Sequence, residues 1–300
     1  MIRLITGLFV VSILLSPNSS AQTISGAIAS DTTWSGTVIA DSVNIPAGRI
    51  LTIKPGSVVR FNNGKMLVIA GRIVANGTYD STITFTSNAA NPVPGSWNGV
   101  ELQNTASVSS VINYCIFEYG GGGPNAANIF YKTGTPNINI SHSVIQRSLN
   151  NGINPRSSSP RISTSMLRFN GGYGVFADLS LNYTIDSCTI SNNTTGGLLI
   201  GVNATTVIIN SSIDSNGIGI FISNSAVPTI IKNNIRRNNI GIQFAGVGGT
   251  QPTITQDTIV NNISWGFLNT STSTTVLARR NYWGSDTGPF NSSSNPTGIG

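Results

Sequence analysis

The chain has 300 residues, of which 9% are charged, and its formal net charge is +6. Soluble domains average about 25% charged residues, so uncharged polar side chains must cover most of this surface. The mild positive charge does not indicate a nucleic-acid partner, because such binding relies on many lysine and arginine contacts with phosphates.

Residues 1–21 have the pattern of an export signal. Arg3 supplies the positive charge, positions 4–15 form an apolar segment, and positions 19–21 are small residues suited to cleavage. The apolar segment has about 12 residues, whereas a membrane span needs about 20. We therefore expect a secreted or cell-surface protein whose mature chain begins at Gln22 and contains no transmembrane segment.

Residues 22–110 contain short runs of β-branched and aromatic residues separated by turn formers. Examples are 51–53 and 58–61, with Pro-Gly at 55–56 and Asn-Asn-Gly at 62–64. Such runs between glycine, proline and asparagine predict short strands joined by turns. We interpret this part as an N-terminal cap followed by the first, irregular coils of a solenoid.

Residues 111–290 repeat at intervals of 22 to 24 residues. The first apolar column is Ile140, Ile162, Ile185, Ile208, Ile230 and Ile254, and the second is Ile145, Leu167, Ile190, Ile213, Ile235 and Ile259. A polar column is Ser148, Asn170, Asn193, Asn216, Asn238 and Asn262, and a glycine column is Gly152, Gly174, Gly197, Gly219, Gly241 and Gly266. A fixed period of this length is typical of a solenoid.

The local pattern within each repeat favours strands over helices. The apolar residues alternate or form short runs, they are mostly β-branched, and glycine and asparagine follow within a few positions. The sequence thus predicts an all-β fold, a single-stranded parallel β-helix of nine or ten coils with three short strands per coil. We expect the isoleucines to stack inward, the asparagines to take left-handed turns and bond one another, and the glycines to have positive φ.

The last repeat differs from the others. It places Trp283 of the 281–284 motif, Asn-Tyr-Trp-Gly, in the second apolar column, where the ring would cover the open end of the stack. The tail, 291–300, is interpreted as a divergent end or as the end of a truncated chain.

Cys115 and Cys188 share one column three coils apart, about 14 Å at normal strand spacing. A disulfide needs Cα atoms within about 7 Å, so we expect two free, buried thiols.

Several segments resemble secreted bacterial right-handed parallel β-helix proteins. These segments are 48–61, 71–78, 83–87, 97–100 and 281–284 with Gly288 and Pro289. Proteins of this group share the pectin-lyase-like fold and repeats of the carbohydrate-binding and sugar-hydrolase type, and the resemblance covers nearly the whole mature chain. It implies a right-handed coil. It does not imply one function, because the group includes polysaccharide lyases, hydrolases and surface binding proteins.

Two acids are the candidate catalytic residues. Hydrolysis of a polysaccharide requires two carboxylates about 5 to 10 Å apart, and Asp178 precedes the coil of Asp186 closely enough to approach it. The sequence does not fix such a pair. The alternative is that both are ordinary turn and surface acids.

Four arginines lie one or two residues after the second apolar column, namely Arg147, Arg168, Arg236 and Arg237. They are expected along one edge of the solenoid, where they could bind an acidic glycan or simply keep the surface soluble. Asp214, one coil before Arg236, is expected to form a surface ion pair of little energetic worth.

Aromatic side chains offer a second route to sugar binding. Tyr119 and Tyr131 are the named candidates, within a cluster near residues 120–124 that also includes Tyr114, Phe130 and Tyr173. Exposed aromatic faces beside hydrogen-bonding groups suit sugar rings. The alternative is that these rings pack a loop against the coil wall.

No metal or cofactor is expected, because His142 is the single histidine and a zinc site needs several histidine or cysteine ligands. The sequence leaves open an isolated calcium site at a loop.

We expect a non-catalytic, carbohydrate-binding scaffold that is monomeric. The alternatives are a polysaccharide lyase or glycoside hydrolase of the same fold, and a structural module of a longer adhesin.

Overall fold

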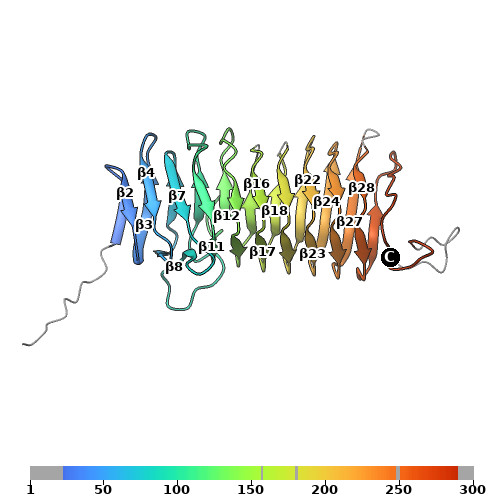
Figure 1. Cartoon of the computed structure of the whole chain (residues 1–300), viewed down its shortest axis with the longest axis horizontal. Coiled ribbons are helices and arrows are strands. Elements are labelled where there is room, and N and C mark those ends of the chain that lie inside the picture. Colours follow the sequence, from blue (N-terminus) through green and yellow to red (C-terminus); the bar gives the residue numbers. More distant parts are fainter. Residues whose placement is uncertain (1–22, 157, 180–181, 248–250, 290–300) are drawn as a thin grey trace, which may run out of the picture.

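The computed structural model describes residues 23–156, 158–179, 182–247 and 251–289. The expected signal segment, 1–21, and the tail, 291–300, lie outside these residues. The described chain forms one elongated solenoid of strands, and Figure 1 shows the coils following one another from β2 to β28. No described residue belongs to a helix that is long and apolar enough to cross a membrane.

Each coil contributes one strand to face 1, a parallel sheet of ten strands. These strands are β2 (Thr32–Trp34), β4 (Ile50–Ile53), β7 (Arg72–Asn76), β10 (Val111–Asn113), β13 (Ile140–Ser141), β16 (Arg161–Ser163), β19 (Thr184–Asp186), β22 (Val207–Ile209), β25 (Thr229–Ile231) and β28 (Thr253–Thr255). Ten strands correspond to ten coils, within the predicted range.

Faces 2 and 3 belong to a single sheet of 20 strands. Face 2 contains β5 (Val58–Phe61), β8 (Ile83–Ser87), β11 (Cys115–Glu118), β14 (Val144–Gln146), β17 (Met166–Arg168), β20 (Thr189–Ser191), β23 (Ser212–Asp214), β26 (Asn234–Arg236) and β29 (Thr258–Val260). Face 3 contains β6 (Met66–Ile69), β9 (Gly99–Leu102), β12 (Ala127–Tyr131), β15 (Asn151–Asn154), β18 (Tyr173–Ala177), β21 (Gly196–Ile200), β24 (Ile218–Asn224), β27 (Ile240–Gly246) and β30 (Trp265–Asn269). The long strand β3 (Thr37–Ile45) pairs with both β5 and β6, and β1 (Thr23–Ala27) pairs with β3.

Three corners connect the faces of each coil. The first corner joins face 1 to face 2, the second joins face 2 to face 3, and the third, with longer turns, joins face 3 to the next strand of face 1. The strands pair in parallel in the predicted register, so that Ile162 lies beside Ile140 and Ile235 beside Ile213. The prediction of a parallel β-helix is therefore confirmed.

The interior is a continuous apolar stack. The isoleucines of both predicted columns are buried, and most are fully inaccessible to solvent. In the less regular N-terminal coils, aromatic rings replace them: Phe61 stacks on Trp97 at 4.5 Å between ring centres, and Phe85 on Phe117 at 4.6 Å. Because every coil buries apolar area against the next, hydrophobic burial is distributed along the whole solenoid.

The expectation of positive φ in the glycine column is wrong. None of these six glycines has a left-handed backbone. A Cβ on Gly152 would lie 2.6 Å from the carbonyl oxygen of Gly174, and one on Gly197 would lie 2.5 Å from that of Gly219. Glycine is needed here because consecutive coils approach too closely to admit a side chain.

The asparagines do not take the left-handed position either. That position belongs to the residue before each of them, for example Phe169 with φ 56° and Arg237 with φ 53°. The asparagine that follows turns inward. Asn193 Nδ2 donates to the Asn216 side-chain oxygen at 3.0 Å, and the pattern recurs along the column. We call this column the amide ladder.

The C-terminal coil closes one end of the stack. Trp283 is 7% exposed and belongs to the apolar core, and Asn281 accepts a hydrogen bond from the Asp257 backbone.

The two cysteines are free and buried, as predicted. Burial raises the pKa of the Cys115 thiol to about 12 and that of Cys188 to about 11, so neither thiol is a nucleophile near neutral pH.

Candidate functional site

Two separate hollows lie along the first corner of the solenoid. At each coil the chain passes through a left-handed residue, then a small polar residue that points inward, then an outward residue of face 2. The left-handed residues are Tyr114, His142, Thr164, Ser187, Asn210, Lys232, Gln256 and Arg280, with φ between 47° and 61°. The outward residues are Val144, Met166, Thr189, Ser212, Asn234 and Thr258. We call the strip of surface between these two columns, which contains both hollows, the corner furrow.

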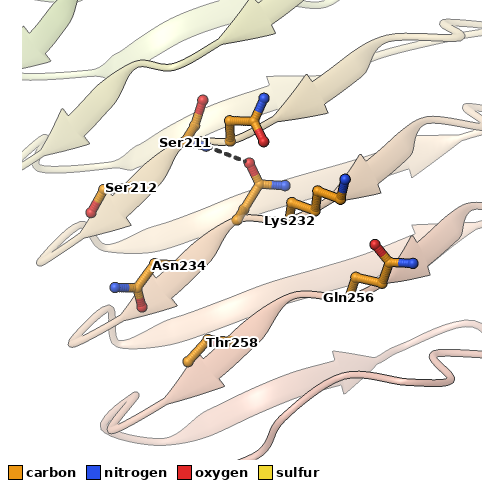
Figure 2. A pocket seen from close by; sticks show the side chains of 8 residues that line it. Ser211, Ser212, Lys232, Asn234, Gln256 and Thr258 are labelled. Carbon is orange, nitrogen blue, oxygen red and sulfur yellow. Dashed lines mark hydrogen bonds between the residues drawn. The ribbon is translucent and has the colours of Figure 1, made fainter.

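Over the C-terminal coils the corner furrow contains a polar hollow of about 390 Å³. Figure 2 shows Lys232 and Gln256 on one side of it and Ser212, Asn234 and Thr258 on the other. Most of the lining groups are hydroxyls and amides, which both donate and accept hydrogen bonds. The side-chain oxygen of Asn234 is buried and has no hydrogen-bond partner among the described residues.

A second hollow, of about 320 Å³, lies on the same two columns over earlier coils. Its lining includes two stacked rings, Tyr114 and His142, whose centres are 4.6 Å apart and whose planes differ by 12°. Tyr79, at 84% exposure, stands at its other side, and Met166 is 44% exposed. The furrow is thus polar towards the C-terminus and aromatic towards the N-terminus.

The four predicted arginines lie beside the second corner, in two adjacent columns. Arg168 and Arg236 point outward from face 2, and Arg147 and Arg237 occupy left-handed positions. All four already have partners. Arg168 Nε donates to the Gln146 side-chain oxygen at 3.0 Å, so this edge offers fewer open donors to an acidic glycan than the sequence suggests.

Glu118 is the residue of this edge that sequence reasoning missed. Its carboxylate accepts hydrogen bonds from Thr86 at 3.2 Å and from Gln146 at 2.7 Å, and Arg147 lies 3.8 Å away. The Arg147 guanidinium also lies 5.6 Å from the ring centre of Tyr119. Glu118 comes just before the loop at 120–126, where the repeat is interrupted. The one sequence signal that it belongs to this edge is its position in the same column as Gln146 and Arg168.

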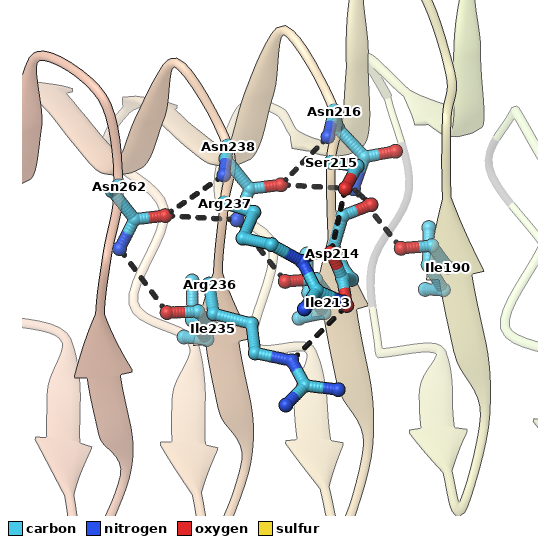
Figure 3. Close-up of polar contacts among 10 residues, drawn as sticks. All are labelled: Ile190, Ile213, Asp214, Ser215, Asn216, Ile235, Arg236, Arg237, Asn238 and Asn262. Carbon is cyan, nitrogen blue, oxygen red and sulfur yellow. Dashed lines mark hydrogen bonds and ion pairs between the residues drawn. The ribbon is translucent and has the colours of Figure 1, made fainter.

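Asp214 forms the strongest charged cluster of the edge (Figure 3). Arg236 Nε donates to its carboxylate at 3.0 Å, Arg237 Nε at 2.9 Å and Ser215 Oγ at 2.7 Å. Burial alone raises the pKa of Asp214, but the hydrogen bonds from Arg237, Ser215 and Arg236 outweigh it and lower the pKa below its ordinary value. The expected ion pair between Asp214 and Arg236 is present, and both arginines of the cluster remain partly exposed. The aspartate itself is 7% exposed and accepts hydrogen bonds on both oxygens.

The structure does not bring the two candidate catalytic acids into one site. Asp178 follows β18 and lies 4.0 Å from Arg156. Asp186 ends β19 on face 1, where it forms an ion pair with Arg161 and accepts a hydrogen bond from Ser187 at 2.9 Å. The two carboxylates therefore have different partners, which favours the alternative that they are ordinary turn and surface acids.

Tyr131 cannot contact a ligand, which corrects its choice as a candidate. It points inward from β12, is fully buried, and donates its hydroxyl to the Ile138 carbonyl at 2.6 Å. Tyr119, by contrast, is half-buried at the second corner under Arg147. Among the described residues no three histidine, cysteine or acidic side chains gather as metal ligands.

The chain is similar to several solved structures. It has 11% identity and a TM-score of 0.49 with tailspike protein 2 of Escherichia coli O157:H7 bacteriophage CAB120, covering 82% of this chain and 38% of that one. It has 15% identity and a TM-score of 0.48 with endopolygalacturonase I from Stereum purpureum, covering 87% and 100%. Pectate lyase Pel9A gives 14% identity and a TM-score of 0.36, covering 79% and 72%.

Comparison with curated protein sequences gives no match. A family model does match, over residues 127–282, which is more than half of the chain. These residues run from β12, through the regular coils, to the residue before Trp283. The chain therefore belongs to the family described as the right-handed beta helix region, and its coil is right-handed.

Proposed function

We propose that this protein is a secreted or cell-surface scaffold that binds a glycan along the corner furrow without cleaving it. The observation that carries the proposal is the furrow itself. Its two hollows lie on the same pair of residue columns, one rich in hydroxyls and amides and the other aromatic. Extended sugar chains present alternating hydroxyl groups and apolar ring faces, and both kinds of lining suit them.

The partners of the acidic side chains support a binding role over a catalytic one. Asp186 and Asp214 are each held by an arginine, and Glu118 is held by Thr86 and Gln146. A general acid needs a raised pKa and a base needs access to the reacting proton. Asp257, whose pKa burial raises to about 6, lies inside the solenoid, where no glycan reaches it.

The test is a screen of the mature chain against neutral and acidic polysaccharides. Binding is measured by calorimetry, and cleavage is measured as new reducing ends or unsaturated products. We expect binding without product. Product from any glycan would overturn the non-catalytic proposal, and the absence of both would leave a structural module of a longer adhesin as the account to test next.

A matched pair of variants locates the site. Asn234→Ala removes a side chain from the polar hollow, while Thr229→Ala removes one from face 1 of the same coil. We expect the first to weaken glycan binding and the second to leave it unchanged. Equal effects would place the glycan elsewhere. The monomeric state that we propose is checked in the same samples by sedimentation.

A further inference from the structure

We propose that the aromatic hollow of the corner furrow binds a ring of an uncharged glycan, with the imidazole of His142 as the platform. This inference rests on the proposed function, because it names one contact and one ligand class within the furrow. It assigns a binding role to the single histidine of the chain. Neither the repeat nor the fold requires a histidine at this position.

The ring of His142 is held in place before any ligand arrives. It stacks on Tyr114, and its Nδ1 lies 3.0 Å from the side-chain oxygen of Asn113. Ser141 donates to the same oxygen at 2.9 Å, and Asn113 in turn donates to Asn76 at 2.8 Å. A ring fixed by stacking and by a hydrogen-bond network loses little freedom on binding, so more of the contact energy appears as affinity.

The ring stack ends at His142. The next residue of the left-handed column is Thr164, which is exposed and too small to cover the imidazole. Beside it stand Val144 and the exposed Met166, which give the hollow an apolar side. A sugar ring that continued the stack would place its C–H face on the imidazole and its hydroxyls near Thr164.

The charges around the hollow favour an uncharged sugar. Its lining contains no lysine, arginine, aspartate or glutamate. The four predicted arginines lie beside the second corner, where Asp214 already engages two of them, and Lys232 and Arg280 of the first corner lie over later coils. Burying a carboxylate without a cation is costly, so a uronic acid ring would bind here less well than a glucose, xylose or mannose ring.

A stack retained only for packing is the competing explanation, and two substitutions separate the explanations. H142N keeps the left-handed backbone, which asparagine tolerates, but removes the aromatic face. H142F keeps the face, and Phe169 shows that phenylalanine takes this backbone conformation in the same solenoid. If the ring face binds a sugar, H142N loses glycan affinity and H142F retains it. If the ring serves only packing, H142N has a lower free energy of unfolding but an unchanged glycan affinity.

The experiment measures calorimetric affinity for oligosaccharides of glucose, xylose and mannose and for oligogalacturonate. The imidazole C–H signals of the single histidine are followed by NMR in parallel. We expect a neutral oligosaccharide to shift these signals, H142N to lose about fivefold to tenfold in affinity, the value of one aromatic contact, and H142F to retain most of it.

Each other outcome is decisive. If a neutral glycan binds but the histidine signals stay still and H142N binds normally, this inference fails while the proposed function stands. If oligogalacturonate alone binds and shifts the signals, the ligand class is wrong. If no glycan binds the parent chain, the proposed function fails and this inference fails with it.

Discussion

The two tight corners of each coil both place polar side chains inside the solenoid, but with different chemistry. The second corner uses the nearly uniform amide ladder. The first corner uses a mixed column, which we call the first-corner ladder, of Ser143, Ser165, Cys188, Ser211, Asn233, Asp257 and Asn281. Both columns accept the backbone N–H of the preceding coil, as Ser211 does from Cys188 at 3.1 Å and Asn216 does from Asn193 at 3.0 Å.

The difference lies in how far each side chain must reach. Ser211 Oγ donates to the Ile209 carbonyl of its own coil at 2.8 Å, so a hydroxyl satisfies the first corner. Asn216 Nδ2 donates at 3.0 Å both to the Ile190 carbonyl of the preceding coil and to the Asn238 oxygen of the following one. Only an amide has the length and the two donors for this, and the second corner has one in every coil from Asn170 to Asn262. The first corner accepts either a hydroxyl, as in Ser211, or an amide with the same reach, as in Asn233. The second corner is therefore restrictive and the first permissive, and the furrow lies over the permissive one.

The largest effect is expected where the apolar stack between the two corners is broken. Ile213 is fully buried on β23. Ile213→Asp would bury a carboxylate without a partner, and we expect a loss of at least about 4 kcal/mol in the free energy of unfolding. Ile209→Asp is the matched control, because Ile209 points outward beside Asp186 in the register of face 1. Denaturant unfolding that gave similar losses for both would contradict the inward direction of Ile213.

The next effect concerns the one acid in the first-corner ladder. Asp257 accepts hydrogen bonds from the Asn233 backbone and side chain at 2.7 and 2.9 Å, but its Oδ2 is buried and has no partner among the described residues. In Asn233 the corresponding position is an N–H group that donates to the Ile208 and Ile231 carbonyls. An ionised Asp257 has no proton to donate. Burial accordingly raises its pKa to about 6, against the opposing hydrogen bonds from Asn233.

Because the folded pKa is higher than the unfolded one, the folded state binds more protons between about pH 4 and pH 6, and stability falls as the pH rises through this window. Above about pH 6 the loss in the free energy of unfolding reaches about 3 kcal/mol. Asp257→Asn supplies the missing donor. We expect it to raise the free energy of unfolding by up to that amount at pH 7.5 and to change little at pH 3.5. Equal effects at the two pH values in urea unfolding would show that ionisation of Asp257 is not the cause.

A smaller effect is expected for two substitutions that compare the two corners directly. Asn216→Ser removes donors to two neighbouring coils and leaves buried groups unsatisfied, so we expect a loss of about 2 kcal/mol. Ser211→Asn places in the first corner the residue that Asn233 already supplies one coil later, and the loss should stay below about 1 kcal/mol. Thermal unfolding of the two variants measures the contrast. A reversed order would mean that the first corner is the restrictive one.

The repeat period made the coil, its register and the buried isoleucines predictable, because stacking forces equivalent residues into one column. It did not reveal the direction of residues at the corners. Histidine, lysine, threonine and tyrosine all occupy the left-handed positions of the first corner, so composition carries no signal of the furrow. Tyr119 and Tyr131 were equivalent candidates by sequence, yet one borders a corner and the other fills the core. That distinction depends on strand alternation through the loop at 120–126, where the period is interrupted.

The smallest effect tests how permissive the first corner is. Cys188 occupies this ladder between Ser165 and Ser211, and its thiol lies 3.4 Å from the Ile162 and Asp186 carbonyls. A serine hydroxyl is smaller and less apolar but makes the stronger hydrogen bond, so the two changes oppose each other. We expect Cys188→Ser to change the free energy of unfolding by less than about 1 kcal/mol, with Cys115→Ser as the parallel case. A loss of several kcal/mol on thermal unfolding would show that the column selects for size and that its mixed composition reflects a different space at each coil.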